Sequence, residues 1–385
     1  MAQTERDQIT MRSHVHRFTL TDPGNVSPLA EAFRSGQLDP ATVVAVIGKT
    51  PGNGLVNDYT RGYLTQSLAL LIGSHTGQSW QQVTERVPFI FSGGTEGVLT
   101  PHITVFCAEP GERSRASSIY SASADTSASP GLAIATAFTP ALAPDAIGRN
   151  GQALATAEAV RNAMTAAGIN DPADVHFVQV KGPCLTAAKM AEARSQGLAV
   201  AGTSADQSMA LSRVASAFGV ALALGEIQED QLEEAAFLTD FRLWSGVASC
   251  SSGIEVSCNE IVLLGNSRHW QSDYRIGHRP MADALDIRAI YDLIDELGLD
   301  PAAPEIAAAF VKCEPDRRGL IRGQPHTMLN DGDLNPQRHI RGAVGAIAAA
   351  VFSDTRIFVS GGAEHQGPDG GGTVTAIARK PELAP

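Results

Sequence analysis

The chain has 385 residues, of which 43% are hydrophobic and 18% are charged, and its formal net charge is −12 at pH 7. This composition predicts a globular protein of two or three domains, or one internally repeated body, and excludes a disordered chain and a disulfide scaffold. The acidic balance, the lack of a membrane-length apolar run in the sequence and a polar N-terminus unlike a secretory signal predict a cytoplasmic protein that binds neither nucleic acid nor membrane.

Taken in chain order, three segments repeat the same succession of predicted elements, which indicates an internal repeat. Each opens with a helix that ends near a glycine. An Asp-Pro turn follows, because proline fixes its own φ and moves the preceding residue out of the α region. An apolar, strand-like run comes next. The predicted helices are 27–34, 156–167 and 287–297, and the predicted strands are 43–49, 175–181 and 306–312.

Each apolar run ends in a lysine, and an arginine opens the helix of small residues that follows. A single lysine at a strand end is most often solvated, but three at equivalent positions indicate a shared function. An arginine at the start of a helix opposes the helix dipole, so we expect it to serve a ligand or a carboxylate. The repeated residues are Lys49, Lys181 and Lys312, followed by Arg61, Arg213 and Arg341.

The most specific repeated element reads Ser, then Gly or Ser, then Gly, any residue and Glu. It occurs at 92–96, 251–255 and 360–364. We call these segments the serine modules. Their glycines let a ligand or backbone approach closely and expose backbone N–H groups. The repeat predicts an α/β fold of three similar units, 1–112, 120–270 and 275–381, about a pseudo-threefold axis, with sheets inside and helices outside.

Such an arrangement would bring three lysines, three arginines and three serines to one central site. A lysine whose pKa is lowered by burial and neighbouring cations can take the proton of a serine, which then attacks a carbonyl group. Two other interpretations stay open. The arginines could pair with the glutamates of the serine modules, with or without a ligand role, and the site could bind a small planar anion without catalysis.

With these motifs the sequence resembles the cyanuric acid amidohydrolase and barbiturase family, from about His14 to Lys380. The resemblance rests on Gly-Lys-Thr-Pro-Gly-Asn-Gly at 48–54, on the three serine modules and on the glycine-rich segment 360–372. It implies hydrolytic opening of a cyclic imide ring without an organic cofactor. Cyanuric acid would give carboxybiuret and then biuret and CO₂, and barbituric acid is the alternative substrate.

The resemblance also implies roles for particular residues. Lys181 would be the base and Ser251 the nucleophile. Gln337 shares a helical face with Arg341 if that stretch is helical, and we assign it to sensing the ring edge. The residues implied to bind substrate are Lys49, Arg61, Ser92, Gly93, Arg213, Ser251, Ser252, Lys312, Arg341, Ser360 and Gly361.

A structural divalent metal is a further implication of the resemblance. Its ligands would be Glu314 together with positions that offer mostly backbone oxygens, a donor set that suits Mg²⁺ or Ca²⁺. Those positions are Ala363, Gln366, Gly367, Pro368 and Gly371. The resemblance further implies a homotetramer. The first 13 residues precede the family core, and we expect them to form a tail.

Overall fold

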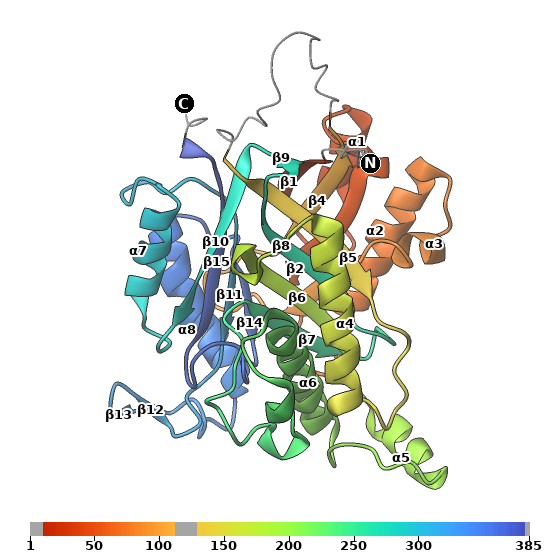
Figure 1. Cartoon of the computed structure of the whole chain (residues 1–385), viewed down its shortest axis with the longest axis vertical. Coiled ribbons are helices and arrows are strands. Elements are labelled where there is room, and N and C mark those ends of the chain that lie inside the picture. Colours follow the sequence, from red (N-terminus) through yellow and green to blue (C-terminus); the bar gives the residue numbers. More distant parts are fainter. Residues whose placement is uncertain (1–10, 112–128, 382–385) are drawn as a thin grey trace, which may run out of the picture.

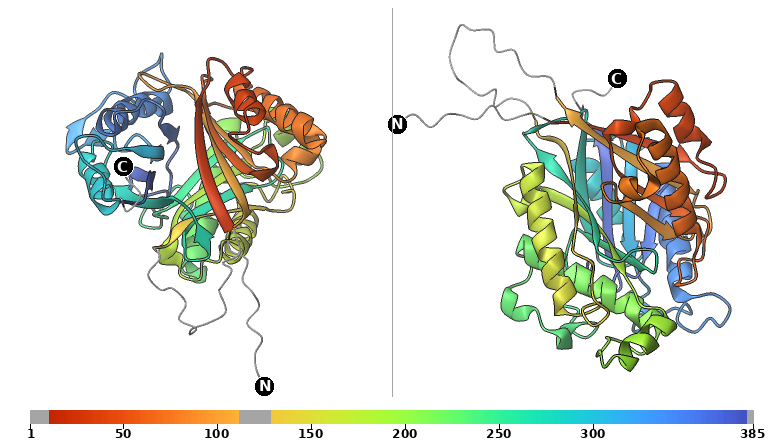
Figure 2. Two further views of the ribbon diagram at one scale, coloured as in Figure 1. Left: turned by 90° about the horizontal axis from the view of Figure 1, so that it is seen from above. Right: turned by 90° about the vertical axis from the view of Figure 1, so that its right-hand side faces the viewer.

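The computed structural model describes residues 11–111 and 129–381. Within these residues, three main sheets form the body of the protein and helices cover them (Figure 1). Seen from above in Figure 2, the N-terminal, central and C-terminal segments follow one another around a common middle. The protein is therefore a mixed α/β protein, as the sequence predicts. The first ten residues and the predicted unit boundary between 112 and 120 lie outside the described residues.

The three main sheets share one topology. In each, the second strand pairs in parallel with the third and antiparallel with the fourth, and the fourth pairs antiparallel with the first. The first sheet contains β1 (Met11–Thr19), β2 (Val43–Thr50), β3 (Phe89–Gly93) and β4 (His102–Pro110). The second contains β5 (Gly131–Phe138), β6 (Val175–Pro183), β7 (Ala248–Gly253) and β8 (Glu260–Ser267). The third contains β10 (Tyr274–Met281), β11 (Ile306–Cys313), β14 (Phe358–Gly361) and β15 (Gly372–Arg379).

Three short strands lie outside this scheme. The strand β9 (Trp270–Gln271) extends the first sheet by pairing in parallel with β1. A small hairpin joins β12 (Leu320–Ile321) and β13 (Gln324–Pro325). The helices are α1 (Ser27–Arg34), α2 (Thr60–Thr76), α3 (Trp80–Thr84), α4 (Asn150–Ala167), α5 (Ala187–Ser195), α6 (Ala205–Leu224), α7 (Ile287–Glu296) and α8 (Pro336–Phe352).

The predicted Asp-Pro turns are confirmed in all three repeats, and in the third the N–H of Ala302 donates to the Asp300 side chain at 2.9 Å. Asp39 precedes a short 3₁₀ helix at Pro40–Thr42 and accepts a hydrogen bond from the N–H of Ala41. Asp171 does the same for the N–H of Ala173. The aspartate caps the turn while the proline supplies the φ angle of its first position, so each dipeptide leads the chain from a helix into the second strand of its sheet.

Several sequence expectations are wrong in detail. Arg61 lies at the start of α2, but Arg213 and Arg341 lie inside α6 and α8 and do not open them. Polar residues at the front of these two helices, capped by Ser204 and Asn335, extend them beyond the apolar stretch that marked them in the sequence. Residues 11–13 belong to β1 and are not part of a tail.

One aromatic side chain from each main sheet packs at the middle of the core. Phe310 of β11 lies 4.7 Å from Phe177 of β6 and 6.4 Å from Phe106 of β4, measured between ring centroids. All three side chains are buried. Because buried aromatic rings remove large apolar areas from water, this cluster holds the three sheets to one another and fixes the middle of the molecule.

The helix α6 is long and apolar enough to cross a membrane by length and composition alone. Inside the fold, however, 72% of its apolar window is buried. Its residues pack against α4 and against the strands β6 and β7. Burial of this kind is typical of a core helix, so the finding gives no support for a membrane span.

Candidate active site

The second and third strands of each sheet bring one lysine and one serine together. In parallel pairing, the lysine on the second strand lies directly opposite the serine on the third. The lysines are almost fully buried, and the serines are buried as well. The register therefore explains why two residues far apart in the sequence meet three times. The opposed pairs are Lys49 with Ser92, Lys181 with Ser251, and Lys312 with Ser360.

A cavity lies where the three serine modules meet. Each module contributes its serine and the residue after it, namely Gly93, Ser252 and Gly361. Lys181 lines the cavity, whereas Lys49 and Lys312 lie behind their serines and are not among the lining residues that the structure describes. Polar side chains that are far apart in the sequence therefore line the same cavity. Its other polar lining side chains are Ser92, Ser251, Ser360, Arg61, Arg213 and Arg341.

Two of the lysines bond directly to the serine opposite them. Lys49 donates to Ser92 Oγ at 3.1 Å, and it also bonds the carbonyl of Gly93. Lys312 donates to Ser360 Oγ at 3.0 Å and to the carbonyl of Gly361 at 2.8 Å. At these distances a neutral amine could accept the hydroxyl proton.

The third lysine has different partners. Lys181 Nζ lies 2.7 Å from Glu255 Oε1 and donates to the carbonyls of Phe91 and Ser252 at 3.2 and 3.4 Å. Ser251 Oγ donates to the carbonyl of Val180 at 3.4 Å. The pair that the resemblance makes catalytic is therefore the one pair, within the described residues, that is not joined by a hydrogen bond.

Each arginine pairs with the glutamate of another unit's serine module. Arg341 in the C-terminal segment donates to both carboxylate oxygens of Glu96, at 2.7 and 3.0 Å. Arg213 forms the same bidentate pair with Glu364. Arg61 Nε lies 2.8 Å from Glu255 Oε1. The sequence suggested these glutamates as partners.

The three arginine–glutamate pairs close a ring around the cavity. The N-terminal segment's arginine binds the central segment's glutamate, the central arginine binds the C-terminal glutamate, and the C-terminal arginine binds the N-terminal glutamate. Each glutamate both neutralises an arginine and holds its guanidinium at the cavity wall. The arginines can consequently keep both roles that the sequence left open, a carboxylate partner and a ligand-binding group.

Burial acts on all three lysines. Burial and the nearby Arg341 hold the pKa of Lys49 well below its ordinary value. Burial, with Arg213 adding to it, lowers the pKa of Lys312 to about 7. Burial also lowers the pKa of Lys181, although the adjacent Glu255 opposes the shift. Burial thus favours the neutral amines, although the module glutamates oppose the shift, and neutral amines are suited to accept protons.

The glycines of the serine modules make room for the arginines. Gly362 has φ +74°, and a Cβ atom there would lie 2.4 Å from Nε of Arg213. Gly94, with φ +99°, would place a Cβ atom 2.5 Å from a terminal nitrogen of Arg341. A side chain at either position would displace the guanidinium. The sequence predicted that these glycines let a ligand or backbone approach closely. At these two positions the group that approaches is an arginine side chain of the protein itself.

Gln337 lies beside the cavity wall but does not line the cavity. Its Oε1 accepts a hydrogen bond from the N–H of Gly362 at 2.6 Å. The residue thus supports the third serine module from α8. Its assignment to the ring edge remains a prediction.

The residues proposed to hold a metal gather around the glycine-rich segment after β14. Glu314 is buried, and its carboxylate has no hydrogen bond or ion pair to any other residue that the structure describes. Burial and the neighbouring Glu364 raise its pKa well above the ordinary value. Gln366 uses its side chain to bind the N–H of Cys250 and the carbonyl of Gly362, so only its backbone oxygen is left for a metal. A buried carboxylate without a partner beside backbone carbonyls fits a hard divalent cation.

Sequence reasoning missed three residues near the cavity. Asp58 is buried and accepts the N–H of Gly54, which lines the cavity. Met209 adds an apolar contact to the lining. Glu260 lies opposite Lys181 in the register between β6 and β8. Only Glu260 had a usable signal in the sequence, because it directly precedes the apolar run 261–264.

The family described as amidohydrolase ring-opening proteins matches residues 14–379 of the chain. A cyanuric acid amidohydrolase from Azorhizobium caulinodans is 47% identical over 366 residues, covering 95% of this chain and 98% of the relative. One from Ectopseudomonas oleovorans is 46% identical over 375 residues, covering 96% of this chain and 100% of the relative.

Solved structures agree with these sequence relatives. A cyanuric acid hydrolase structure superposes with a TM-score of 0.89 at 42% identity, covering 96% of this chain and 100% of that one. The A. caulinodans cyanuric acid hydrolase gives a TM-score of 0.87 at 46% identity, covering 96% of this chain and 99% of that one. The family match, over residues 14–379, spans the positions of all the residues that line the cavity.

Proposed function

The chain belongs to the family of ring-opening amidohydrolases, and from this membership and the cavity we propose that it hydrolyses cyanuric acid and opens the triazine ring to carboxybiuret. One observation carries the proposal most directly. Three serines and three arginines line one cavity, and each segment contributes one serine and one arginine. A triazine ring has three equivalent carbonyl groups, so it offers one carbonyl oxygen to the polar groups of each segment. Its near relatives carry the name of the same activity.

We also infer that the three units, 1–112, 120–270 and 275–381, are related by a pseudo-threefold axis through the cavity. The common strand topology supports this inference. The ring of arginine–glutamate pairs supports it further, because every link joins one segment to another in the same sense. The lysines also link neighbouring segments, in the reverse sense, since Lys181 of the central segment reaches the carbonyl of Phe91 and Lys312 of the C-terminal segment reaches that of Cys250.

In the proposed reaction, neutral Lys181 takes the proton of Ser251, and Ser251 Oγ attacks a ring carbonyl. Backbone N–H groups of the serine module stabilise the oxyanion. The ring C–N bond then breaks, and the proton held by Lys181 passes to the departing nitrogen. Water, activated by the same amine, cleaves the acyl-enzyme and restores the serine. The carboxybiuret loses CO₂ to give biuret.

The choice of Lys181 among the three lysines rests on its position. It is the lysine that lines the cavity among the described residues, and so it can reach a bound ring without passing a serine. The contacts of Lys49 with Ser92 and of Lys312 with Ser360 leave those two serines as candidates for the nucleophile. Ser92 and Ser360 would otherwise bind the remaining carbonyl groups.

A structural divalent cation, Mg²⁺ or Ca²⁺, completes the proposal. Glu314 would bind it together with backbone oxygens at Ala363, Gln366, Gly367, Pro368 and Gly371. When bound, it would compensate the charge of Glu314 and hold the segment after the third serine module. Glu364, the last residue of the third serine module, positions Arg213, so the cation would act on the site through the arginine. We propose no catalytic step for it.

The function is tested by incubating the purified chain with cyanuric acid and, separately, with barbituric acid. We expect biuret from cyanuric acid and slower opening of the pyrimidine ring. Faster opening of barbituric acid would assign the chain to the barbiturase activity instead. Binding of cyanuric acid without any biuret would favour a binding protein. The assembly state, expected to be a homotetramer, is measured on the same sample by light scattering.

A further inference from the structure

A second pocket, of about 550 Å³, lies next to the central cavity, between the N-terminal and central segments. Glu255 forms part of its wall and also contacts Arg61 and Lys181, which line the central cavity. A volume of this size is typical of sites that bind small organic molecules. The proposed hydrolysis takes place in the central cavity and leaves this pocket without a function.

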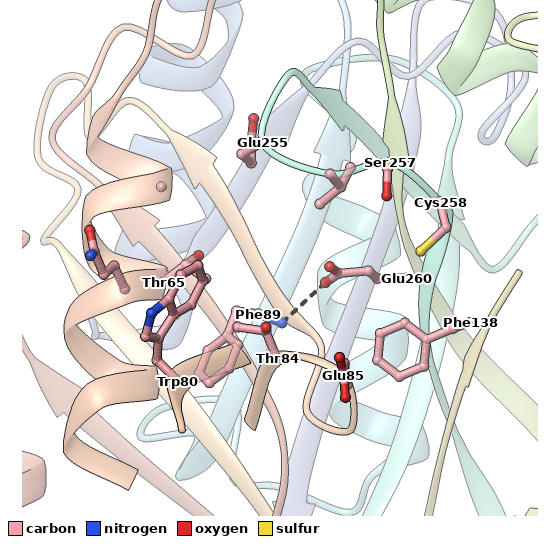
Figure 3. Close-up of a pocket in the computed structure, with 13 residues that line it drawn as sticks. Thr65, Trp80, Thr84, Glu85, Phe89, Phe138, Glu255, Ser257, Cys258 and Glu260 are labelled. Carbon is pink, nitrogen blue, oxygen red and sulfur yellow. Dashed lines mark hydrogen bonds between the residues drawn. The ribbon is translucent and has the colours of Figure 1, made fainter. Parts of the chain in front are cut away.

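Aromatic rings form much of the wall of this second pocket. Trp80 begins α3, Phe89 begins β3 and Phe138 ends β5. In the view of Figure 3, Trp80 and Phe138 lie on opposite sides of the pocket. The side chain of Trp80 is 39% exposed, so part of its indole ring is available to a ligand. The faces of such rings attract flat organic groups and cations.

The charges in the wall are all negative. Glu85, Glu255 and Glu260 line the pocket, and its lining residues in the described part of the chain include no lysine, arginine or histidine. An acidic wall repels anions, so the pocket does not suit the carboxylate product of the proposed reaction. It favours a ligand with a positive charge.

Two of these carboxylates have no cation to pair with. Glu255 is already paired with Lys181 and Arg61, whereas Glu85 and Glu260 form no ion pair with any residue that the structure describes. Figure 3 shows the carboxyl group of Glu260 turned toward Phe89, whose backbone N–H donates to Oε2 at 3.2 Å. The second oxygen, Oε1, is left for a ligand.

The arrangement of the acids does not suit a metal ion. Within residues 11–111 and 129–381, no group of three or more His, Cys, Asp or Glu side chains is placed to hold one. The carboxylates are instead distributed around a pocket with aromatic walls. Such a wall fits an organic cation whose charge is spread over a flat group, because the same group can stack on a ring and donate N–H bonds to a carboxylate.

We propose that this pocket is a second binding site, for a flat organic cation of the amidinium or guanidinium class. The N–H groups of the cation would donate to Glu260, and its flat face would pack against Trp80. Glu85 would add a negative charge at the exposed side of the pocket. This site is separate from the proposed hydrolysis and does not depend on it.

Binding of a cation should be coupled to the release of a proton from Glu260. Burial raises the pKa of Glu260 to about 8, the Phe89 N–H and the charge of Lys181 oppose the rise, and Glu255 adds to it. A bound cation favours the ionised carboxylate, so its affinity should rise with pH up to about 8 and then level off. The titratable and charged groups around Glu260 are Lys181 on β6, Glu255 after β7, Cys258 before β8, Glu85 after α3 and, through Glu255, Arg61 on α2.

The test uses benzamidine, a flat amidinium cation, and benzamide, a neutral molecule of nearly the same shape. Each is titrated calorimetrically into the full chain without cyanuric acid, at a pH above the pKa of Glu260. Benzamidine should bind the wild type at least about tenfold more tightly than benzamide does, and Glu260→Gln should remove that difference. Trp80→Ala should weaken benzamidine binding about threefold. Glu158→Gln, which removes an exposed carboxylate of α4 outside the pocket, should bind like the wild type.

Three results overturn the proposal: no binding of benzamidine at millimolar concentration, equal affinity for benzamidine and benzamide, or equal affinity of the wild type and Glu260→Gln for benzamidine. If Glu260→Gln does not fold, an unchanged affinity in Trp80→Ala overturns it. Titrations in buffers of different ionisation enthalpy should show release of about one proton per benzamidine near neutral pH, and none in Glu260→Gln. Because none of these measurements needs turnover, they test the pocket even if the chain does not hydrolyse cyanuric acid.

Discussion

The amine of Lys181 lies 2.7 Å from Oε1 of Glu255, and the same carboxylate oxygen contacts Arg61. Burial alone would raise the pKa of Glu255, but Lys181 and Arg61 outweigh it and lower the pKa to about 2. This shared carboxylate holds a base and a substrate-binding arginine at one point of the cavity wall. It also opposes the loss of the lysine's proton.

The role of that carboxylate is tested by Glu255→Gln. Removing the charge should lower the pKa of Lys181 further, so that the acid limb of kcat/KM moves to lower pH. KM should also rise several-fold, because Arg61 loses the shorter of its two ion pairs and keeps only the 3.9 Å contact with Asp58.

The matched control for this variant is Glu96→Gln. Glu96 holds Arg341 but has no ion pair with a lysine within the part of the chain that the structure describes. It should raise KM without moving the acid limb. Equal movement of the limb in both variants would contradict the special position of Glu255.

The three serines should differ in function although they occupy equivalent positions. Ser251→Ala should lower kcat by about 10³-fold or more, because it removes the nucleophile. Ser92→Ala and Ser360→Ala should mainly weaken substrate binding, by about tenfold each, because each removes one hydrogen bond to the ring. Steady-state kinetics of the three variants on cyanuric acid give the comparison. Similar mild losses in all three would rule out the assigned division of roles.

Stability should depend on pH through Glu260. Its pKa of about 8 in the folded protein exceeds the ordinary value of 4.5, so the folded state holds more protons than the unfolded state between these values. The contribution to stability is present below about pH 4.5 and is lost as the pH rises through about 8. Glu260→Gln should therefore melt above the wild type at about pH 8, with a gap that narrows toward about pH 4.5. Calorimetry at several pH values measures the gap, and a pH-independent difference would be the contrary result.

Metal removal should destabilise the segment around Glu314. We expect a chelator to lower Tm by several degrees and added Mg²⁺ or Ca²⁺ to restore it, because a ligand that binds only the folded state stabilises it. In Glu314→Gln the melting temperature should no longer respond to the cation. Elemental analysis of the purified chain measures the bound metal directly. A Glu314→Gln variant that keeps the full metal response would show that the cation binds elsewhere.

Much of this site could be predicted because its motifs occur three times in the sequence. The lysine that closes the second strand and the serine that ends the third are found by their repetition, and strand register alone then places Lys49 opposite Ser92. The predicted helices and second strands also agree with the structure to within a few residues, apart from α4, α6 and α8, which begin earlier.

The features that the sequence could not show are those set by tertiary contacts. Repetition does not say which glutamate binds which arginine, and the partner of Arg341 comes from the N-terminal segment. The first strand of each sheet was missed, and in β10 glycine, proline and charged residues interrupt the apolar pattern. Glu260 looked like an ordinary polar strand end until the register placed it beside Lys181.

The most direct test of the account is to identify the residue that carries the acyl group during turnover. Cyanuric acid is mixed with the enzyme, the reaction is quenched in acid within the first turnover, and the peptides are analysed by mass spectrometry. We predict a ring-opened adduct on the peptide that contains Ser251, and its loss in Ser251→Ala. An adduct on Ser92 or Ser360, or active turnover with no adduct on any serine module, would contradict the account.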